Sequence, residues 1–271
     1  MKKTLIYAAL SLFVAFAVAC KKDSTEEQPL YPSSDYQLST DGKVLEKWLN
    51  PETISVDMQK DIKLREVTSI APESFKDRKK LTSIVISDKV EHIRYRAFEN
   101  CTQLTNVHIP NGVTTLGLES FTKCYNLVSI TIPSTIQSVG NQAFYDSGLK
   151  TVTIKDGVKN IETGAFRECR GLITINFPNT LTHIGDYAFY DCYNLPSVNL
   201  PKSIESIGRD AFGNCGSLTT MTVNATTPPV IKSTTFSKFT VRRISVPASS
   251  VNAYKIAESW SEFSDKIVAL P

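Results

Sequence analysis

The sequence predicts a solenoid, in which the chain winds through about seven stacked turns of 22–24 residues and a cap closes each end. Each turn should consist mostly of short parallel strands joined by tight turns and short helical pieces. Three observations support this fold class: a phenylalanine that recurs at a nearly constant interval, an alternating apolar pair that follows it, and proline and glycine in register with both.

The recurring phenylalanine defines the repeat. Its successive intervals are 23, 23, 23, 22, 23, 23 and 24 residues, a small residue precedes most copies, and a leucine follows about six residues later. A fixed period of this length is typical of proteins that stack one structural unit many times. The phenylalanines are Phe75, Phe98, Phe121, Phe144, Phe166, Phe189, Phe212 and Phe236.

Two apolar residues separated by one position follow each leucine, as in Val107/Ile109 and Ile130/Ile132. Alternation with a period of two predicts a short strand with one face turned inward. Proline ends this strand in four turns, because it has no N–H to donate to a ladder. A second apolar pair then precedes a glycine such as Gly117, which we expect to supply a backbone conformation that other residues resist.

One turn cannot bury its apolar side chains alone, so neighbouring turns must complete the core, with parallel strands about 4.8 Å apart. The repeats should occupy residues 71–225, between an N-terminal cap at 36–70 and a C-terminal cap at 226–271. In the second cap, Ile244 to Pro247 predicts the last strand. The stretch 251–260 predicts a short helix whose aromatic face covers the last turn.

The unit at residues 104–124 resembles the BspA-type leucine-rich repeat, and so do residues 172–192 and 195–215. The resemblance extends from about residue 36 to the end of the chain. It implies a leucine-rich-repeat solenoid of the α/β type, found in bacterial surface lipoproteins, and it supplies the expectation of an adhesive role.

Some turns depart from the family pattern. The turn near Phe144 is one residue shorter and has Ser147 where cysteine is usual, and Ser87 and Lys155 replace proline. We interpret these departures as local variants of the corners that leave the fold unchanged.

The N-terminus predicts export and a lipid anchor. Residues 1–19 combine two lysines with about 15 apolar residues, which is typical of a signal peptide and short of the roughly 20 needed to span a bilayer. Small residues before Cys20 resemble a bacterial lipobox, although Ala17 stands where leucine is usual. The alternative is an ordinary signal peptide that is cleaved elsewhere.

Residues 20–35 are polar and charged, which predicts a flexible, lipidated tether. The acidic residues in this segment resemble the surface-export signal of Bacteroidetes lipoproteins. We therefore expect an outer-membrane lipoprotein exposed on the cell surface, with display toward the periplasm as the alternative. The membrane is expected to be a partner only through the N-terminal lipid.

Five cysteines lie three residues after a repeat phenylalanine: Cys101, Cys124, Cys169, Cys192 and Cys215. Stacked turns place their β-carbons near the strand spacing of about 4.8 Å, wider than the mean of about 3.8 Å in a disulfide. We therefore predict a buried column of free thiols, and a Cys192–Cys215 disulfide is the alternative.

No constellation of residues predicts catalysis, a metal site or a cofactor. His92 and His183 share a repeat position four turns apart, and His108 stands alone on the outward side of a strand. Asp146, Glu168 and Asp191 recur two residues after the phenylalanine, a turn position where we expect solvated carboxylates. We therefore predict that the protein is not an enzyme.

The outward positions of the predicted strands form the candidate binding face. They carry small hydroxyl and amide side chains, which are suited to holding a protein or glycan through many weak contacts; the alternative is that such residues merely favour exposed strands. The candidate residues are Asn106, His108, Ser129, Thr131, Thr151, Thr153, Thr174, Asn176, Ser197 and Asn199. A possible second surface consists of the tyrosines Tyr125, Tyr145, Tyr190 and Tyr193.

These features predict a monomeric, non-enzymatic surface lipoprotein that binds an extracellular protein or glycan, in adhesion or in contact with a host or neighbouring cell. The alternative is a glycan-binding accessory of a nutrient-uptake system. Without Lys2 and Lys3 the chain has 28 basic and 27 acidic residues, so its charge offers no reason to expect nucleic acid as a partner.

Overall fold

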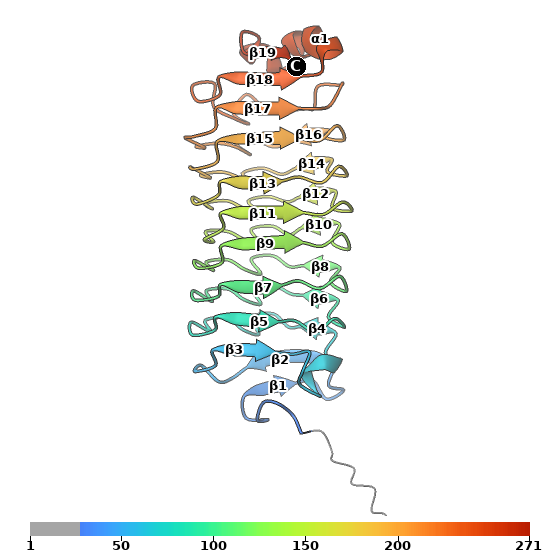
Figure 1. Cartoon of the computed structure of the whole chain (residues 1–271), viewed down its shortest axis with the longest axis vertical. Coiled ribbons are helices and arrows are strands. Elements are labelled where there is room, and N and C mark those ends of the chain that lie inside the picture. Colours follow the sequence, from blue (N-terminus) through green and yellow to red (C-terminus); the bar gives the residue numbers. More distant parts are fainter. Residues whose placement is uncertain (1–27) are drawn as a thin grey trace, which may run out of the picture.

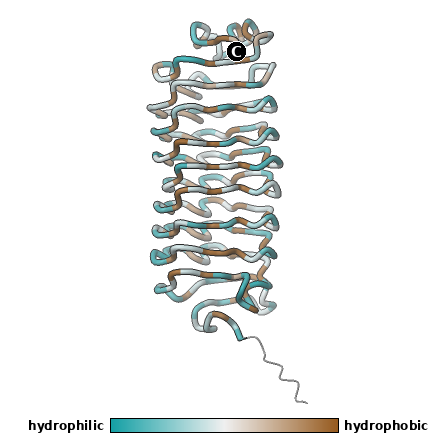
Figure 2. The backbone as a smooth tube through the Cα atoms, viewed as in Figure 1, coloured by the Kyte–Doolittle hydropathy of each residue, from teal (hydrophilic) through white to brown (hydrophobic). Residues whose placement is uncertain are grey.

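The computed structural model describes residues 28–271 and contains a single solenoid in which short strands stack along one axis (Figure 1). The predicted signal peptide, Cys20 and the first half of the predicted tether, residues 20–27, lie outside the described residues. Figure 2 shows hydrophilic residues gathered at the turns on both edges of the column. None of the helices in residues 28–271 combines the length and the apolar character that crossing a membrane requires.

The first wall consists of the predicted strands and one further strand at each end, which the sequence analysis did not predict. Its three parallel sheets contain three, three and four strands. The strands are β3 (Ser55–Asp57), β5 (Ser83–Val85), β7 (Asn106–His108), β9 (Ser129–Ile132), β11 (Thr151–Ile154), β13 (Thr174–Asn176), β15 (Ser197–Leu200), β17 (Thr220–Val223), β18 (Arg243–Val246) and β19 (Ile267–Ala269).

The second wall is one nine-stranded sheet formed by the second apolar pair of each turn. Its strands are parallel except for an antiparallel pair, β1 and β2, at the N-terminal end. They are β1 (Tyr36–Leu38), β2 (Val44–Trp48), β4 (Ser69–Ile70), β6 (His92–Ile93), β8 (Thr115–Leu116), β10 (Ser138–Val139), β12 (Asn160–Ile161), β14 (His183–Ile184) and β16 (Ser206–Ile207).

The third wall contains the repeat phenylalanines, and backbone hydrogen bonds also connect its turns. The N–H of Phe121 donates to the carbonyl of Ala143 in the next turn at 2.7 Å, and the equivalent bond recurs at every repeat phenylalanine from Phe75 to Phe212. Most turns are therefore bonded to their neighbours on three sides, and the rest on two, which makes the column stiff.

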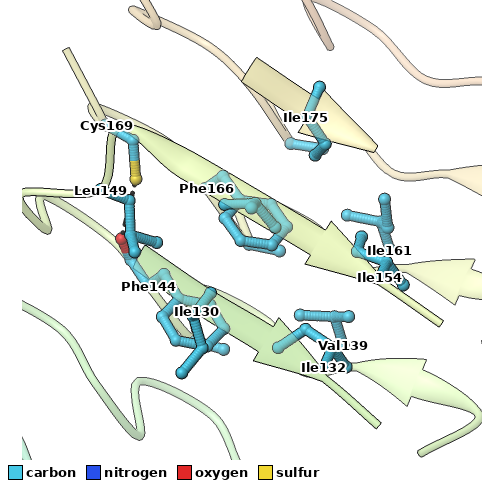
Figure 3. Close-up of a cluster of buried hydrophobic side chains, with 14 of the residues drawn as sticks. Ile130, Ile132, Val139, Phe144, Leu149, Ile154, Ile161, Phe166, Cys169 and Ile175 are labelled. Carbon is cyan, nitrogen blue, oxygen red and sulfur yellow. Dashed lines mark hydrogen bonds between the residues drawn. The ribbon is translucent and has the colours of Figure 1, made fainter. Parts of the chain in front are cut away.

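The phenylalanine column is confirmed. The rings from Phe75 to Phe212 stack with successive centroids 4.9–5.5 Å apart and interplanar angles of 11° or less. Figure 3 shows Phe144 and Phe166 among the inward side chains of the strands, including Ile130 and Ile161. Every repeat phenylalanine is buried, so this column is the centre of the core.

Glycine has a different role from the predicted one. Gly140 has no positive φ, but a β-carbon there would lie 2.3 Å from the carbonyl oxygen of Leu116 in the preceding turn. The glycine is therefore required by close contact between two backbones. The left-handed conformation occurs two residues after each of Gly117 and Gly140. It is adopted by Glu119, with a φ of 57°, and by Gln142, with a φ of 52°.

The solenoid has about ten turns, so the prediction of about seven counts too few. At the N-terminal end, Trp48 takes the place of a repeat phenylalanine and stacks on Phe75 with centroids 5.5 Å apart. Tyr31, from the predicted tether, packs edge-on against Trp48, and the backbone N–H of Asp57 donates to its hydroxyl. Ordered packing therefore begins before residue 36.

The C-terminal cap agrees with the prediction in its aromatic cover and differs in its strands. The helix α1 (Val251–Ile256) is shorter than predicted, and Trp260 lies on the following 3-10 helix η3 (Trp260–Phe263). Phe263 packs on Phe236, which closes the core. The strand β19 extends the ladder beyond β18, so β18 is not the last strand. The remaining 3-10 helices are η1 (Leu64–Glu66) and η2 (Ala248–Ser250).

Candidate binding surfaces

The ten residues of the candidate binding face point outward from the first wall, as predicted. We call them the strand face. Thr151 pairs in register with Ser129 on one side and with Thr174 on the other, so equivalent residues form rows across the turns. Nine of the ten residues are exposed, and Thr153 is half-buried. None of them is a carboxylate, lysine or arginine, so the face carries no permanent charge.

The strand face is not a continuous ladder. The hydrogen-bonded sheets are interrupted between β7 and β9 and again between β13 and β15. The face therefore consists of three short sheets in the same orientation, with two seams across it. The alternating apolar pattern contains no sign of these seams, because every strand satisfies it equally well.

A groove of about 420 Å³ lies at the first seam and contains four of the ten predicted residues. Asn106 and His108 come from β7, while Ser129 and Thr131 come from β9. The corner that follows the strands adds Asn111 and Lys155, which were not among the predicted binding residues. These two residues lie outside the alternating pattern that identified the others.

The predicted tyrosine surface lies on the turns that join the third wall to the first, and its neighbouring carboxylates differ from expectation. The side chains of Glu168 and Asp191 are only 18% and 17% exposed, and Arg170 contacts both at 3.1 Å. The hydroxyl of Tyr145 donates to Glu168 at 3.1 Å. These carboxylates are therefore paired with neighbouring turns and are not simply solvated.

Asp146 belongs to the same row. The hydroxyl of Tyr125 donates to its carboxylate at 3.3 Å. Partial burial, together with the nearby charge of Glu168, raises the pKa of Asp146 above its usual range. The hydrogen bond from Tyr125 acts in the opposite direction and supports the charged form.

Arg167, which the sequence analysis did not single out, contacts two of the predicted tyrosines, Tyr145 and Tyr190, and also Tyr187. The guanidinium of Arg167 lies 5.5–5.9 Å from the ring centroids of Tyr145, Tyr187 and Tyr190. These are cation–π contacts between adjacent turns. Arginine has no fixed position in the repeat pattern, so only the aligned turns reveal the cluster.

The five repeat cysteines form the predicted buried column of free thiols. Each thiol donates to the carbonyl of the phenylalanine in the preceding turn, as Cys215 does to Phe189 at 3.1 Å. Ser147 occupies the same place in the short turn and bonds to the sulfur of Cys169 at 3.3 Å. Burial raises the pKa of Cys101, Cys169 and Cys215 to about 12.

The raised thiol pKa values predict a loss of stability in alkali. Below pH 9, the usual thiol pKa, both states are protonated and this contribution is complete. Between pH 9 and about 12 only the unfolded chain ionises, so each thiol lowers the free energy of unfolding by about 1.4 kcal/mol per pH unit. Urea unfolding at pH 8, 9 and 10 measures this slope. In Cys215→Ser it should be smaller; an unchanged slope would contradict the assignment.

The histidines do not converge. His92 lies on β6 and His183 on β14, four strands away in the second wall, as predicted. The Nδ1 atom of His92 contacts the hydroxyl of Thr115 at 3.1 Å. Within residues 28–271, no three His, Cys, Asp or Glu side chains are grouped so that they could hold a metal ion.

Three solved structures resemble the solenoid. A leucine-rich repeat protein from Eubacterium ventriosum is 22% identical with a TM-score of 0.59, covering 68% of this chain and 50% of its own. The T. pallidum leucine-rich repeat protein is 24% identical with a TM-score of 0.47, covering 61% and 90%. A leucine-rich cell surface protein from Faecalibacterium prausnitzii is 21% identical with a TM-score of 0.45, covering 90% and 96%.

The chain spans half the length of the E. ventriosum protein, and at this identity the likeness concerns the fold alone. No protein with a curated description matches the sequence significantly. The family described as the BspA type leucine-rich repeat region matches in six copies, over residues 57–173 and 137–259. These matches include well over half of the residues and coincide with the stacked turns. The chain belongs to the BspA-type leucine-rich repeat family.

Proposed function

We propose that this protein is a non-enzymatic lipoprotein, anchored through Cys20 at the outer membrane and displayed on the cell surface, that binds an extracellular protein through its strand face. The single observation that carries the proposal is the strand face itself. It presents rows of hydroxyl and amide groups that backbone bonds hold in register within each of its sheets, with further bonds between turns on the other two walls.

A stiff, repetitive surface suits macromolecular binding. Its groups are already ordered in the free protein, so a partner that contacts many of them has less conformational entropy to lose from this side. The groove at the seam between β7 and β9 adds a recess for one side chain or terminal group of the partner. The anchor and tether supply the link to the membrane, and the solenoid holds the face away from it.

The placement of the cysteine, histidine and carboxylate side chains favours a binding role over a catalytic one. Cys124 and Cys192 are fully buried, and burial raises the pKa of both thiols well above the usual range, which disfavours the nucleophilic thiolate. The histidines lie on separate turns. The carboxylates of Glu168 and Asp191 are engaged with Arg170.

The test is a binding assay in which the solenoid, residues 28–271, is presented with extracellular matrix proteins and glycans. The variant Thr131→Glu/Thr153→Glu/Asn176→Glu places three charges on adjacent strands of the strand face. We expect it to weaken protein binding by about tenfold or more, because bulky charges would disrupt an uncharged contact.

The control variant Thr114→Glu/Gln137→Glu/Lys159→Glu adds two negative charges and reverses the charge of Lys159 on three adjacent turns of the second wall. It should bind like the unmodified protein. Equal loss in both variants would point to a general effect of charge. Normal binding by the strand-face variant would show that this face is not the contact surface, and binding of glycans alone would favour the accessory role in nutrient uptake.

A further inference from the structure

Tyr193 lies flat against the backbone of the next turn. A β-carbon added to Gly216 would lie 2.5 Å from its Cε2 atom and 2.9 and 3.0 Å from Cδ2 and Cζ, the two ring carbons bonded to Cε2. Three nearly equal, short distances place Gly216 against the face of the ring, because an approach in the ring plane would leave the flanking carbons much farther away. Tyr193 is 56% exposed, so the opposite face is open to solvent.

Tyr125 occupies the equivalent position three turns earlier. Both tyrosines lie four residues after a repeat phenylalanine, and Tyr125 is 47% exposed. At about 4.8 Å per turn the two rings are about 14 Å apart along the solenoid axis. In Figure 1 they belong to the turns that lead into β9 and β15, at one edge of the column. A ligand that touches both must be longer than one sugar ring or one side chain.

Polar groups with planar geometry lie beside Tyr193. Arg170 lies one turn before Tyr193 at the same repeat position, and its backbone carbonyl accepts a bond from the N–H of Asn194 at 3.3 Å. The carboxylate of Asp191 contacts Arg170, and the side chain of Asn194 is exposed. Amide, carboxylate and guanidinium groups beside an exposed ring are the partners that sugar hydroxyls require.

The charges around the two tyrosines cancel when they are counted over the four residues that follow each repeat phenylalanine from Phe121 to Phe189. The acidic residues are Asp146, Glu168 and Asp191, and the basic residues are Lys123, Arg167 and Arg170. A surface that contains three charges of each sign has no electrostatic preference for an anionic polymer such as nucleic acid or a polyuronate.

The aliphatic residues beside the tyrosines argue against a protein partner here. Val128 and Ile173 are 46% and 52% exposed, but Lys150 stands between them in the stacked row. Protein interfaces usually bury a contiguous apolar centre from which lysine is depleted. The interrupted row offers no such centre.

We propose that Tyr125 and Tyr193 are the two ends of a binding site for a neutral polysaccharide that runs along the solenoid axis. The C–H face of a pyranose ring stacks on each tyrosine, and Arg170, Asp191 and Asn194 bind hydroxyl groups between and beside them. This tyrosine platform lies on the turns before the first wall, so it is distinct from the strand face and does not depend on the function proposed for that face.

Affinity electrophoresis of the described solenoid, residues 28–271, in gels containing mannan, starch or xylan tests this proposal, with polygalacturonate as the anionic comparison. At least one neutral polysaccharide should retard the protein, and polygalacturonate should not. We expect Tyr193→Ala and Tyr125→Ala each to weaken retardation by about tenfold, because each removes one stacking surface. Tyr193→Phe keeps the ring and should stay within about twofold.

Gly216→Ala gives a sharper control, because it changes no exposed polar group. Its methyl group displaces the Tyr193 ring from its flat position, while the backbone φ of Gly216 suits alanine. It should weaken polysaccharide binding by about threefold or more and leave the unfolding midpoint nearly unchanged. The strand-face variant should bind the polysaccharide normally.

Three results would overturn the proposal: no retardation by any of the neutral polysaccharides, retardation that survives Tyr125→Ala/Tyr193→Ala, or stronger retardation by polygalacturonate. Circular dichroism of each variant verifies that the solenoid is intact. If protein binding by the strand face fails while mannan, starch or xylan binds through the tyrosines, the function proposed above is wrong and the tyrosine platform stands.

Discussion

Phe144→Ala is expected to lower the free energy of unfolding by about 3–5 kcal/mol, as large-to-small changes at buried aromatic residues do. The ring is fully buried and stacks on Phe121 and Phe166 with centroids 5.5 and 5.3 Å apart. Its removal leaves a cavity in the middle of the column, where neighbouring turns are bonded on three walls and cannot close in. Loss of the central contact should also broaden the unfolding transition, because stacked repeats are coupled through nearest neighbours.

Urea denaturation followed by circular dichroism measures this loss, and Phe239→Ala is the matched control. Phe239 is the same residue type in the same chain but is 88% exposed, so its replacement should change stability by less than about 0.5 kcal/mol. If Phe144→Ala were as harmless as Phe239→Ala, the stacked phenylalanine column would not be the principal core.

Gly140→Ala is expected to destabilise the solenoid by about 1–3 kcal/mol. The new methyl group would lie 2.3 Å from the carbonyl oxygen of Leu116 and 3.1 Å from the backbone of Gly117. Both contacts are with backbone atoms of the preceding turn, which is bonded to its neighbours and cannot move aside. The thermal midpoint of the variant measures the effect.

Gly171→Ala separates this effect from the general consequences of replacing glycine. The nearest atom to an added β-carbon there is 3.5 Å away, an ordinary contact, and φ is not in the left-handed region. This variant should be stabilised by about 0.4–1 kcal/mol, because alanine restricts the unfolded chain. Equal destabilisation of both variants would mean that glycine is required for its backbone freedom and not for close approach between turns.

The parts of the fold that were predictable are those that one turn specifies by itself. A strand of period two, a proline corner and a phenylalanine at a constant interval are local patterns, and stacking copies of the same turn aligns them automatically. The buried phenylalanines, the thiol column and the outward direction of Thr131 and Asn176 follow from this alignment. The strand face was therefore identifiable from the sequence alone.

The turns at the two ends were harder to recognise, because they keep the shape of the repeat without its residues. Trp48 fills the position of a phenylalanine, and β19 adds a strand that the sequence analysis did not predict. A large aromatic ring and a short extended segment satisfy the same packing requirement. Sequence periodicity detects residue types, while the stack responds to volume and backbone bonding.

By itself, the sequence determined the coil, its core and the side of each strand that faces solvent, because these depend on the order of polar and apolar residues within one turn. Only the tertiary structure decided where the sheets of the first wall break, why Gly140 must be glycine and how Tyr193 lies on Gly216. Those features depend on distances between atoms of successive turns, about 23 residues apart in the chain, and a residue-by-residue pattern contains no measure of such distances.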